Sequence, residues 1–291
     1  VRHGVTLTVF SEHVLEALEA RGSGAPPLNI HIKLDTGMSR IGLPDTKRAI
    51  DFIERALRIP SVRVEGLYTH YARADEADKE PTARQHERIL EVVEHFRRKG
   101  MEFPLVHAGN SAAAIDTPEL CFNMVRLGIS LYGLYPSPEV ESGRIPLEPV
   151  LQFVTEVIMV KTLPPGTPVS YGGTYVTRGY EQIATLPVGY GDGYSRMLGG
   201  KASVLIGGRR VPVVGRICMD QCMVNVTGMD VKPGDEAVLI GRQGGEAILA
   251  DELAEWLGTI HYEVVCMISN RVPKVYVREG RRVAVENHLL S

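Results

Sequence analysis

The sequence comprises 291 residues, of which 44% are hydrophobic and 23% charged, and its formal net charge is −3. That length fits one large domain or two of ordinary size, with enough apolar material for a core. An aromatic content of only 6% and a near balance of 32 basic and 35 acidic side chains argue against a nucleic-acid surface. The sequence contains no apolar run long enough to span a membrane. Its 4 cysteines show no metal-ligand spacing, so we expect no metal site and a reducing, cytoplasmic location.

Residues 1–135 are predicted to alternate strands and helices, which is typical of parallel strands covered by helices. The expected strands are 5–10, 28–34, 62–70, 104–108 and 123–129. The expected helices run from Ser11 to about Arg21, between Asp45 and Pro60, from Pro81 to Gly100, and briefly from Ser111.

A polar, proline-bearing connector at 136–147 is predicted to separate this half from a second domain over 148–291. Beyond the connector, short β-branched runs alternate with glycine- and proline-rich turns, a pattern that indicates antiparallel sheet. The expected strands are 151–160, 183–188, 202–206, 211–226, 237–240 and 272–277, interrupted by one amphipathic helix at 249–257.

The second predicted strand carries ionisable residues on one face. Alternation along the strand places His31, Lys33 and Asp35 together. Strands covered by helices are ordinarily apolar on both faces, so this row indicates either a reaction centre or a satisfied structural triad. Arg40 follows in the loop at the strand's carboxyl end, which in a barrel carries the active site.

Later strand ends bear residues of the same kind. Tyr68 and His70 share a face near the end of one strand, Ser111 can open a helix after the next, and Arg126 and Gly128 share a face on the last. A helix N-terminus beside glycine-exposed backbone is the usual phosphate position in a barrel. Together with the arginine of the earlier loop, these residues predict a site for a phosphorylated cofactor.

These segments resemble those of the alanine racemase family, whose members use pyridoxal 5'-phosphate (PLP). The resemblance covers essentially the whole chain and depends on motifs in a fixed order: HIKLDTGMSR (31–40), EGLYTH (65–70), HAGNSA (107–112), NMVRLGI (123–129), VSYG (169–172), GYGDG (189–193), VGRICMDQ (214–221) and ISNRVP (268–273). It implies an N-terminal (β/α)8 barrel that binds PLP, a C-terminal antiparallel β domain, and a homodimer whose active sites are shared between protomers.

The resemblance also implies roles for individual residues. Tyr171 would be one of two catalytic bases and would reach the other protomer's active site, where Met219 would offer its backbone N–H to the substrate. Arg40 would contact both the cofactor and the substrate carboxylate. The other cofactor-binding residues would be His70, Asn110, Ser111, Arg126, Gly128, Ile129 and Asn270. Residues expected behind the site or at its entrance are Lys33, Asp75, Tyr190, Arg196, Arg216 and Asp220.

The implied activity is that of an isomerase that interconverts L- and D-alanine and so supplies D-alanine for peptidoglycan. Removing a proton from one face and returning one to the other needs two bases, while PLP serves as the electron sink. A tyrosine has an ordinary pKa of about 10, so Tyr171 can act as a base only if neighbouring cations favour its phenolate. Arg126 would keep the pyridine nitrogen unprotonated, because a guanidinium cannot accept a proton.

One family feature is unmatched. The family carries its Schiff-base lysine in a characteristic segment at the end of the first barrel strand, and no lysine of this sequence has such surroundings. Lys33 instead matches a position that is carbamylated in some members. We therefore expect the chain to hold barrel strands 4–8 only, with the first three βα units separate, cleaved or omitted. On that expectation the chain alone would be inactive and would not fold unaided.

Other interpretations stay open. A non-catalytic remnant or assembly partner would dimerise through the β domain without chemistry. A PLP decarboxylase, or a single-domain PLP-binding protein, would share the barrel but not the motifs at 169–172 and 214–221. Asn270 stands where some relatives have a tyrosine, and its smaller polar side chain suggests a racemase with broader tolerance toward serine.

Overall fold

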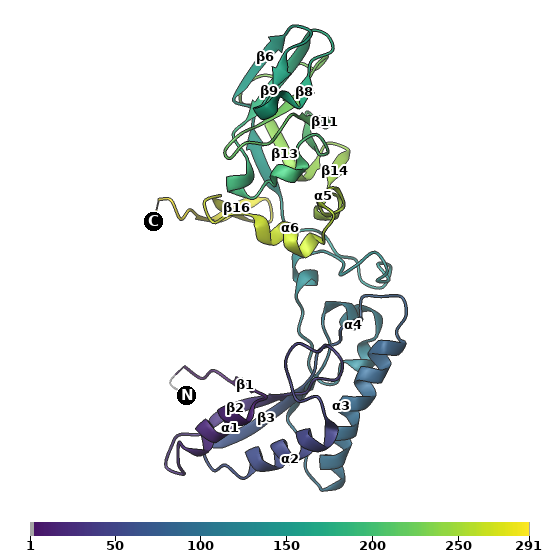
Figure 1. Ribbon diagram of the computed structural model, residues 1–291, viewed down its shortest axis with the longest axis vertical. Coiled ribbons are helices and arrows are strands. Elements are labelled where there is room, and N and C mark those ends of the chain that lie inside the picture. The colour runs from purple at the N-terminus through teal and green to yellow at the C-terminus, as the bar shows by residue number, and fades with distance from the viewer. Residues whose placement is uncertain (1–2, 291) are drawn as a thin grey trace. The chain divides into compact units, whose positions relative to one another are not determined.

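The computed structural model describes residues 3–290, which form two compact units, Val1–Pro149 and Val150–Ser291 (Figure 1). The connector predicted at 136–147 lies at the end of the first unit. Over the described residues, no helix combines the length and the apolar character that crossing a membrane requires.

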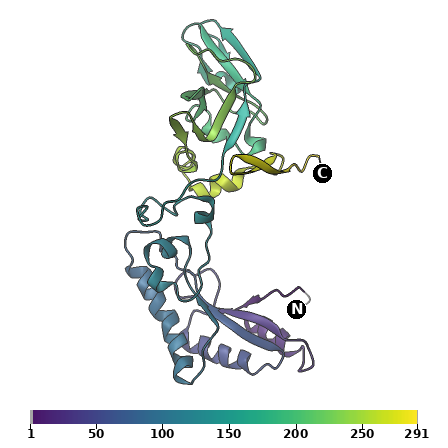
Figure 2. The same cartoon turned by 180° about the vertical axis from the view of Figure 1, so that it is seen from behind.

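The first unit is built on a parallel sheet with the strand order β1-β2-β3-β4 (Figures 1 and 2). Its strands are β1 (Leu7–Val9), β2 (Leu28–Lys33), β3 (Val62–Tyr68) and β4 (Leu105–His107). Its helices are α1 (Glu12–Glu19), α2 (Thr46–Leu57), α3 (Glu80–Arg98) and α4 (Ser111–Asp116), with 3-10 turns at η1 (Pro118–Leu120) and η2 (Ile129–Tyr132). Helices connect successive parallel strands, so the predicted alternation is present in this unit.

Helix α2 shows why the sequence forms these elements. The Asp45 carboxylate caps its N-terminus by accepting the backbone N–H of Arg48 at 2.8 Å. The buried residues of the helix recur at the spacing of one helical face: Ala49, Phe52, Ile53 and Ala56. The helix therefore presents a single stripe to the sheet.

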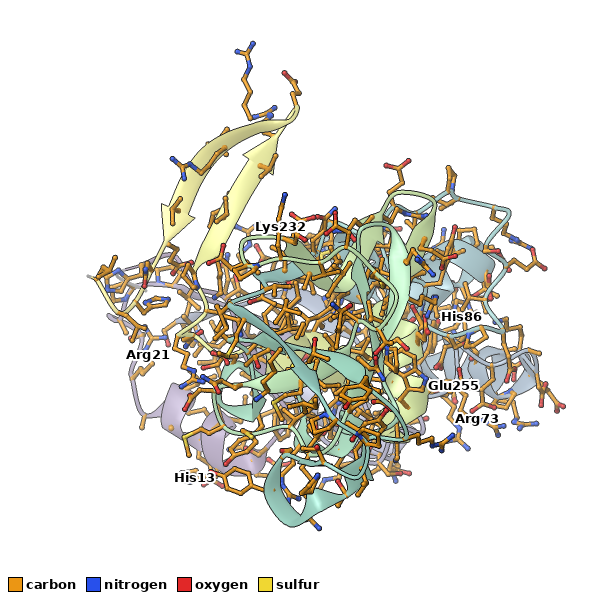
Figure 3. The ribbon with its side chains drawn as sticks, turned by 90° about the horizontal axis from the view of Figure 1, so that it is seen from above. His13, Arg21, Arg73, His86, Lys232 and Glu255 are labelled. Atoms are coloured by element: carbon orange, nitrogen blue, oxygen red, sulfur yellow. The ribbon has the colours of Figure 1, made fainter. Side chains whose placement is uncertain are left out.

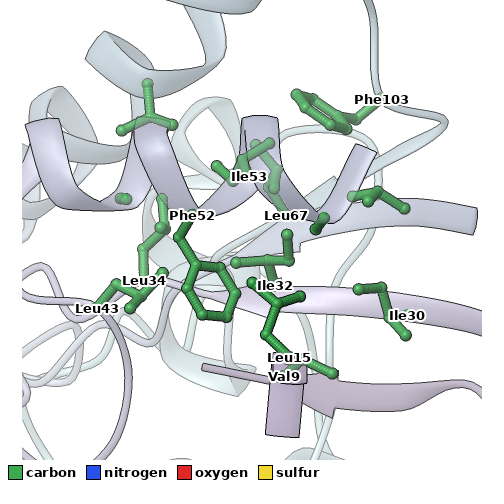
Figure 4. Close-up of a cluster of buried hydrophobic side chains, with 14 of the residues drawn as sticks. Val9, Leu15, Ile30, Ile32, Leu34, Leu43, Phe52, Ile53, Leu67 and Phe103 are labelled. Atoms are coloured by element: carbon green, nitrogen blue, oxygen red, sulfur yellow. The ribbon is translucent and has the colours of Figure 1, made fainter. Parts of the chain in front are cut away.

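The aliphatic face of the sheet packs against helices α1 to α3 to form the core of the first unit (Figure 4). Ile30, Ile32 and Leu67 of the strands are fully buried, as are Leu15 of α1 and Ile53 of α2. Each such side chain contributes about 1.5–3 kcal/mol by leaving water. This face anchors the strands whose opposite face carries the polar residues.

A bulge between β2 and β3 determines which residues reach the polar face. Ile30 pairs with Val64 but His31 pairs with Gly66, so Glu65 is the extra residue. The shift breaks the alternation of β3, and as a result Glu65 and Tyr68 reach the same polar face although they are three positions apart.

The prediction of a strand at 123–129 is wrong. In the described chain this segment makes only an isolated parallel bridge, between His107 and Met124. Other hydrogen bonds replace the regular strand pairing here. Asn123 Oδ1 accepts the N–H of Val106 at 2.8 Å, and the Arg126 N–H donates to the Gly109 carbonyl at 3.0 Å. The sheet of the first unit therefore has four strands, and Arg126 projects from irregular backbone at its end.

The second unit holds an eight-stranded antiparallel sheet, in which the path β14-β13-β10-β11-β12-β9-β6 is joined by β5 pairing with β13. Its strands are β5 (Phe153–Glu156), β6 (Met159–Leu163), β9 (Glu181–Leu186), β10 (Ser203–Ile206), β11 (Arg209–Val214), β12 (Cys222–Asn225), β13 (Glu236–Gln243) and β14 (Glu246–Ile248). The run predicted at 211–226 is two strands, because Gly215 turns the backbone with a φ of 71°. The run predicted at 151–160 is likewise divided between β5 and β6.

Two hairpins and two helices complete the second unit. The hairpins are β7 (Pro168–Val169) with β8 (Tyr175–Val176), and β15 (Lys274–Arg278) with β16 (Arg281–Glu286). The latter extends as the pale yellow ribbon in Figure 3, and all of β15 is exposed. Helix α5 (Ala250–Leu257) matches the predicted helix. Helix α6 (His261–Met267), which follows it, was not predicted from the sequence.

Candidate functional site

Arg126 is the centre of the polar cluster in the first unit. Its Nη1 donates to Nδ1 of His107, and its Nη2 donates to the Thr69 carbonyl at 2.9 Å, to Nδ1 of His70 at 3.2 Å and to the Ala108 carbonyl at 3.4 Å. These four bonds all use the terminal nitrogens. Within the described residues, Nε–H and the second hydrogen of Nη1 are therefore left to donate to a ligand.

The cluster is rich in positive charge. Burial, reinforced by Arg126, lowers the pKa of His70 to about 4 and that of His107 to about 3, so both imidazoles are neutral at physiological pH. Burial also lowers the pKa of Lys33 to about 8; Arg126 and Arg40 add to this shift, while Asp35 opposes it. An anionic ligand would relieve the mutual repulsion of these cations.

The residues predicted on one face of β2 have separate partners. Lys33 is buried, donates from Nζ to the Leu34 carbonyl at 2.7 Å, and lies 5.3 Å from the centre of the Tyr68 ring. Asp35 Oδ1 accepts the backbone N–H of Gly37 at 3.1 Å and of Ser39 at 3.0 Å, which fixes the loop leading to the exposed Arg40. The row is not one triad: its carboxylate shapes a loop and its lysine faces an aromatic ring.

Ser111, at the start of α4, gathers donors from the segment after Arg126. Its Oγ accepts the backbone N–H of Gly128 at 2.9 Å, the backbone N–H of Ser130 at 3.4 Å and the Ser130 hydroxyl at 3.0 Å. Because Ser111 accepts in each of these bonds, its own O–H hydrogen is left to donate. A Cβ on Gly128 would meet no atom closer than this Oγ at 4.0 Å, so there is room beside its backbone.

The other predicted residues of the first unit lie around this segment. Asn110 caps α4 by accepting the Ala113 N–H at 3.0 Å, and its amide donates to the Tyr71 carbonyl at 3.3 Å. Ile129 is buried and begins η2. Asp75 is half-buried, and its carbonyl accepts the Ser137 hydroxyl.

Two histidines were not assigned a role by the sequence. His107 contacts Arg126 directly, and its ring stacks on Tyr68 with centroids 4.7 Å apart. His31 Nδ1 lies 2.9 Å from His107 Nε2. A signal was present, because His107 ends a predicted strand and His31 shares a face with Lys33, but neither pattern names a partner.

Tyr171 lies in a strained turn of the second unit. It follows Ser170, which has φ 65° and ψ −178°, a region that residues other than glycine rarely adopt. Ser170 Oγ donates to the Arg216 carbonyl at 2.6 Å, and a Cβ on Gly172 would lie 3.0 Å from the Arg216 guanidinium. The turn is thus held against Arg216 while the Tyr171 side chain is 71% exposed.

Arg271 joins three of the predicted motifs in the second unit. Its Nε donates to Asp192 Oδ1 at 2.8 Å, and its Nη2 donates to Asp220 Oδ1 at 2.7 Å and to the Met219 carbonyl at 3.4 Å. The sequence predicted Asp220 and Met219 but not this arginine, which follows the exposed Asn270. Tyr190 and Arg196 line one cavity, together with Gly193, Ser195 and Met267.

Comparison with known proteins gives the same family for both units. Residues 1–136 match the family described as alanine racemase, N-terminal domain, and residues 150–276 match alanine racemase, C-terminal domain. The chain is 44% identical to the alanine racemase of Clostridium novyi (strain NT), with 99% of this chain and 76% of that protein covered. It is 45% identical to that of Methanococcus maripaludis, with 95% and 74% covered.

The structure agrees with this likeness. The crystal structure of alanine racemase from Bacillus anthracis with bound L-Ala-P matches with a TM-score of 0.91 at 40% identity, covering 98% of this chain and 74% of that one. Both family domains match in order, and relatives at this identity cover nearly the whole chain. Together these matches identify the family. The chain belongs to the alanine racemase family, whose members use PLP as their cofactor.

Proposed function

We propose that this protein is a PLP-dependent isomerase that interconverts L- and D-alanine. The observation that carries the proposal is the Arg126 cluster, a cation held between two neutral histidines in a chain whose relatives are named alanine racemases. The D-alanine produced would serve peptidoglycan synthesis.

The residues of the first unit fit the cofactor. The concentration of positive charge on Lys33, Arg40 and Arg126 suits an anionic group; the pKa of Lys33 is lowered first by burial and further by the two arginines. Ser111, whose hydroxyl hydrogen is left to donate, and the open backbone beside Gly128 and Ile129 would hold the phosphate, supported by Asn110. When bound, PLP supplies the electron sink for loss of the Cα proton.

Arg126 would orient the cofactor ring through its free Nε–H. A guanidinium keeps its proton at any physiological pH, so a pyridine nitrogen facing it stays unprotonated. His70 accepts from Nη2 and holds the guanidinium from behind. Arg40 would bind the substrate carboxylate, because its loop is fixed by Asp35 and its side chain is exposed.

Tyr171 would move the proton on one face of the substrate. Its turn is rigidly held, and its exposed side chain suits a role in the active site of a partner protomer, where Met219 would offer its backbone N–H. The protein would therefore act as a homodimer with shared sites. Arg216 supplies positive charge near this turn, whereas Arg271, near Met219, is paired with Asp192 and Asp220.

A lysine that binds the cofactor covalently is expected outside the eight lysines at 33, 47, 79, 99, 161, 201, 232 and 274. Lys33 is the nearest to the cluster, but its Nζ is buried and already donates to the Leu34 carbonyl. After borohydride reduction of the holoprotein, peptide mapping should find none of these eight carrying a pyridoxyl group. A label on Lys33 would contradict this assignment.

The role of Tyr171 is tested with a matched tyrosine from the same hairpin. Tyr171→Phe should lower kcat by roughly 10²- to 10⁴-fold, the usual contribution of a general base. Tyr175→Phe should change kcat little, because that hydroxyl donates to Glu181 of β9 at 2.6 Å. Equal kcat values in Tyr171→Phe and the parent would exclude Tyr171 as a base.

A further inference from the structure

A row of polar side chains crosses the sheet of the first unit and ends at Arg126. Nη1 of Arg126 meets Nδ1 of His107 on β4, and Nε2 of His107 lies 2.9 Å from Nδ1 of His31 on β2. Nε2 of His31 then faces Oε2 of Glu65 on β3 at 3.4 Å. We call these three residues, Glu65, His31 and His107, the relay.

The proton positions in the relay follow from one fact. The guanidinium of Arg126 can only donate, so Nδ1 of His107 must be the bare acceptor. A neutral His107 then carries its hydrogen on Nε2 and donates it to Nδ1 of His31. That leaves the hydrogen of a neutral His31 on Nε2, the atom that lies 3.4 Å from Oε2 of Glu65, within ion-pair distance but without hydrogen-bond geometry. The two hydrogen bonds of the relay therefore run in the same direction, toward the carboxylate.

The environment supports the neutral state of His107. Its side chain is buried against the Tyr68 ring, and burial together with Arg126, His31 and Lys33 holds its pKa near 3. An imidazole with such a low pKa accepts from Arg126 throughout the physiological range.

The far end of the relay is anchored by side chains from β2 and from the residue before β1. Glu65 Oε2 accepts the Thr6 hydroxyl at 3.0 Å, and Oε1 accepts the Asn29 side-chain amide at 3.0 Å. Glu65 faces these groups only because of the bulge between β2 and β3. Gly66 leaves space for the His31 ring, since a Cβ there would lie 3.0 Å from Nε2 and 2.7 Å from the Leu105 carbonyl.

We propose that the relay positions the guanidinium of Arg126 through two hydrogen bonds that run in one direction, with the anchored Glu65 carboxylate facing the end of this chain. Two histidines of fixed tautomer and an anchored carboxylate limit rotation of Nη1, and they thereby direct Nε–H to one place. Glu65, His31 and His107 are positioning residues that act through Arg126. The functional part of this inference rests on the proposed function, because Arg126 is the residue we place against the cofactor ring.

The direction of the relay is tested without activity. Long-range ¹H–¹⁵N correlation spectra of histidine-labelled holoprotein, assigned with His31→Gln and His107→Gln, report the tautomer of each ring. His107 should be neutral with its hydrogen on Nε2 between about pH 6 and 8, and His31 should carry its hydrogen on Nε2 and none on Nδ1, which accepts from His107. A hydrogen on Nδ1 of either ring, or a charged His107, would overturn the proposal.

The positioning role is tested with a matched control on the same face. Glu65→Leu should lower kcat and raise the dissociation constant of PLP, each by about tenfold, because it removes the carboxylate that faces Nε2 of His31 at the end of the relay. The KM for alanine should change little. Glu65→Gln keeps an oxygen acceptor and should stay close to the parent, so it covers the case in which Glu65→Leu does not fold.

Thr8→Val is the control, since Thr8 Oγ1 contacts Tyr68 at 2.9 Å outside the relay. Equal losses in Thr8→Val and Glu65→Leu, or parental PLP affinity in a folded Glu65→Leu, would overturn the positioning role. Absence of racemisation by the parent protein would instead contradict the proposed function and leave the tautomer result standing.

Discussion

The lowered pKa of Lys33 predicts a specific dependence of stability on pH. The pKa is about 8 in the folded protein against an ordinary value of 10.5, a difference of 10.5 − 8, or about 2.5 units, which burial causes first. At 1.36 kcal/mol per unit, the folded state is penalised by at most about 3 kcal/mol while Lys33 is charged. Between these two pH values the unfolded chain binds the extra proton, so the free energy of unfolding should rise with pH.

Lys33→Met isolates this effect, because methionine keeps a long flexible side chain of similar length without the charge. Urea unfolding of both proteins should be measured from about pH 7 to about pH 10.5, at equal PLP occupancy and without CO₂. Below about pH 8 the variant should be the more stable protein, and by about pH 10.5 that advantage should have disappeared. A stability difference that does not change with pH would show that the charge on Lys33 does not destabilise the folded protein.

Three further predictions concern single side chains. Asn270→Tyr should lower kcat/KM for serine more than for alanine, measured as the ratio of the two; an unchanged ratio would remove Asn270 from substrate selection. Ser170→Gly should keep most of the activity because glycine tolerates a φ of 65°, whereas Ser170→Val should lower both kcat and melting temperature. Equal activities in these two variants would show that the turn does not direct Tyr171. Ile53→Ala, at a fully buried core position, should cost about 2–5 kcal/mol in denaturant unfolding with an unchanged PLP spectrum. A cost below about 1 kcal/mol would mean that the site is not close-packed.

Much of the fold follows from local signals in the sequence. The capping carboxylate of Asp45 and the apolar spacing after it define α2, and the alternation in β2 separates Ile30 and Ile32 from His31 and Lys33. These signals act within a few residues, so they can be read without tertiary contacts.

What the sequence missed depends on contacts between distant segments. The bulge that brings Glu65 and Tyr68 to one face depends on the register between β2 and β3. Alternation along β3 alone would place these two side chains on opposite faces of the sheet. The segment at 123–129 has strand-like composition, yet Asn123 and Ser111 take up the backbone groups that a ladder would need. Arg271 binds Asp192 and Asp220, which are about 50 to 80 positions away in the sequence, so no local pattern could identify these partners.

Racemisation in heavy water tests most directly whether the protein interconverts L- and D-alanine. The holoprotein should be incubated with L-alanine in D₂O, and both enantiomers followed by chiral chromatography with mass detection. D-alanine should form and carry deuterium at Cα, because the returning proton comes from a base that exchanges with solvent. No D-alanine, or D-alanine that retains the original hydrogen, would contradict this prediction.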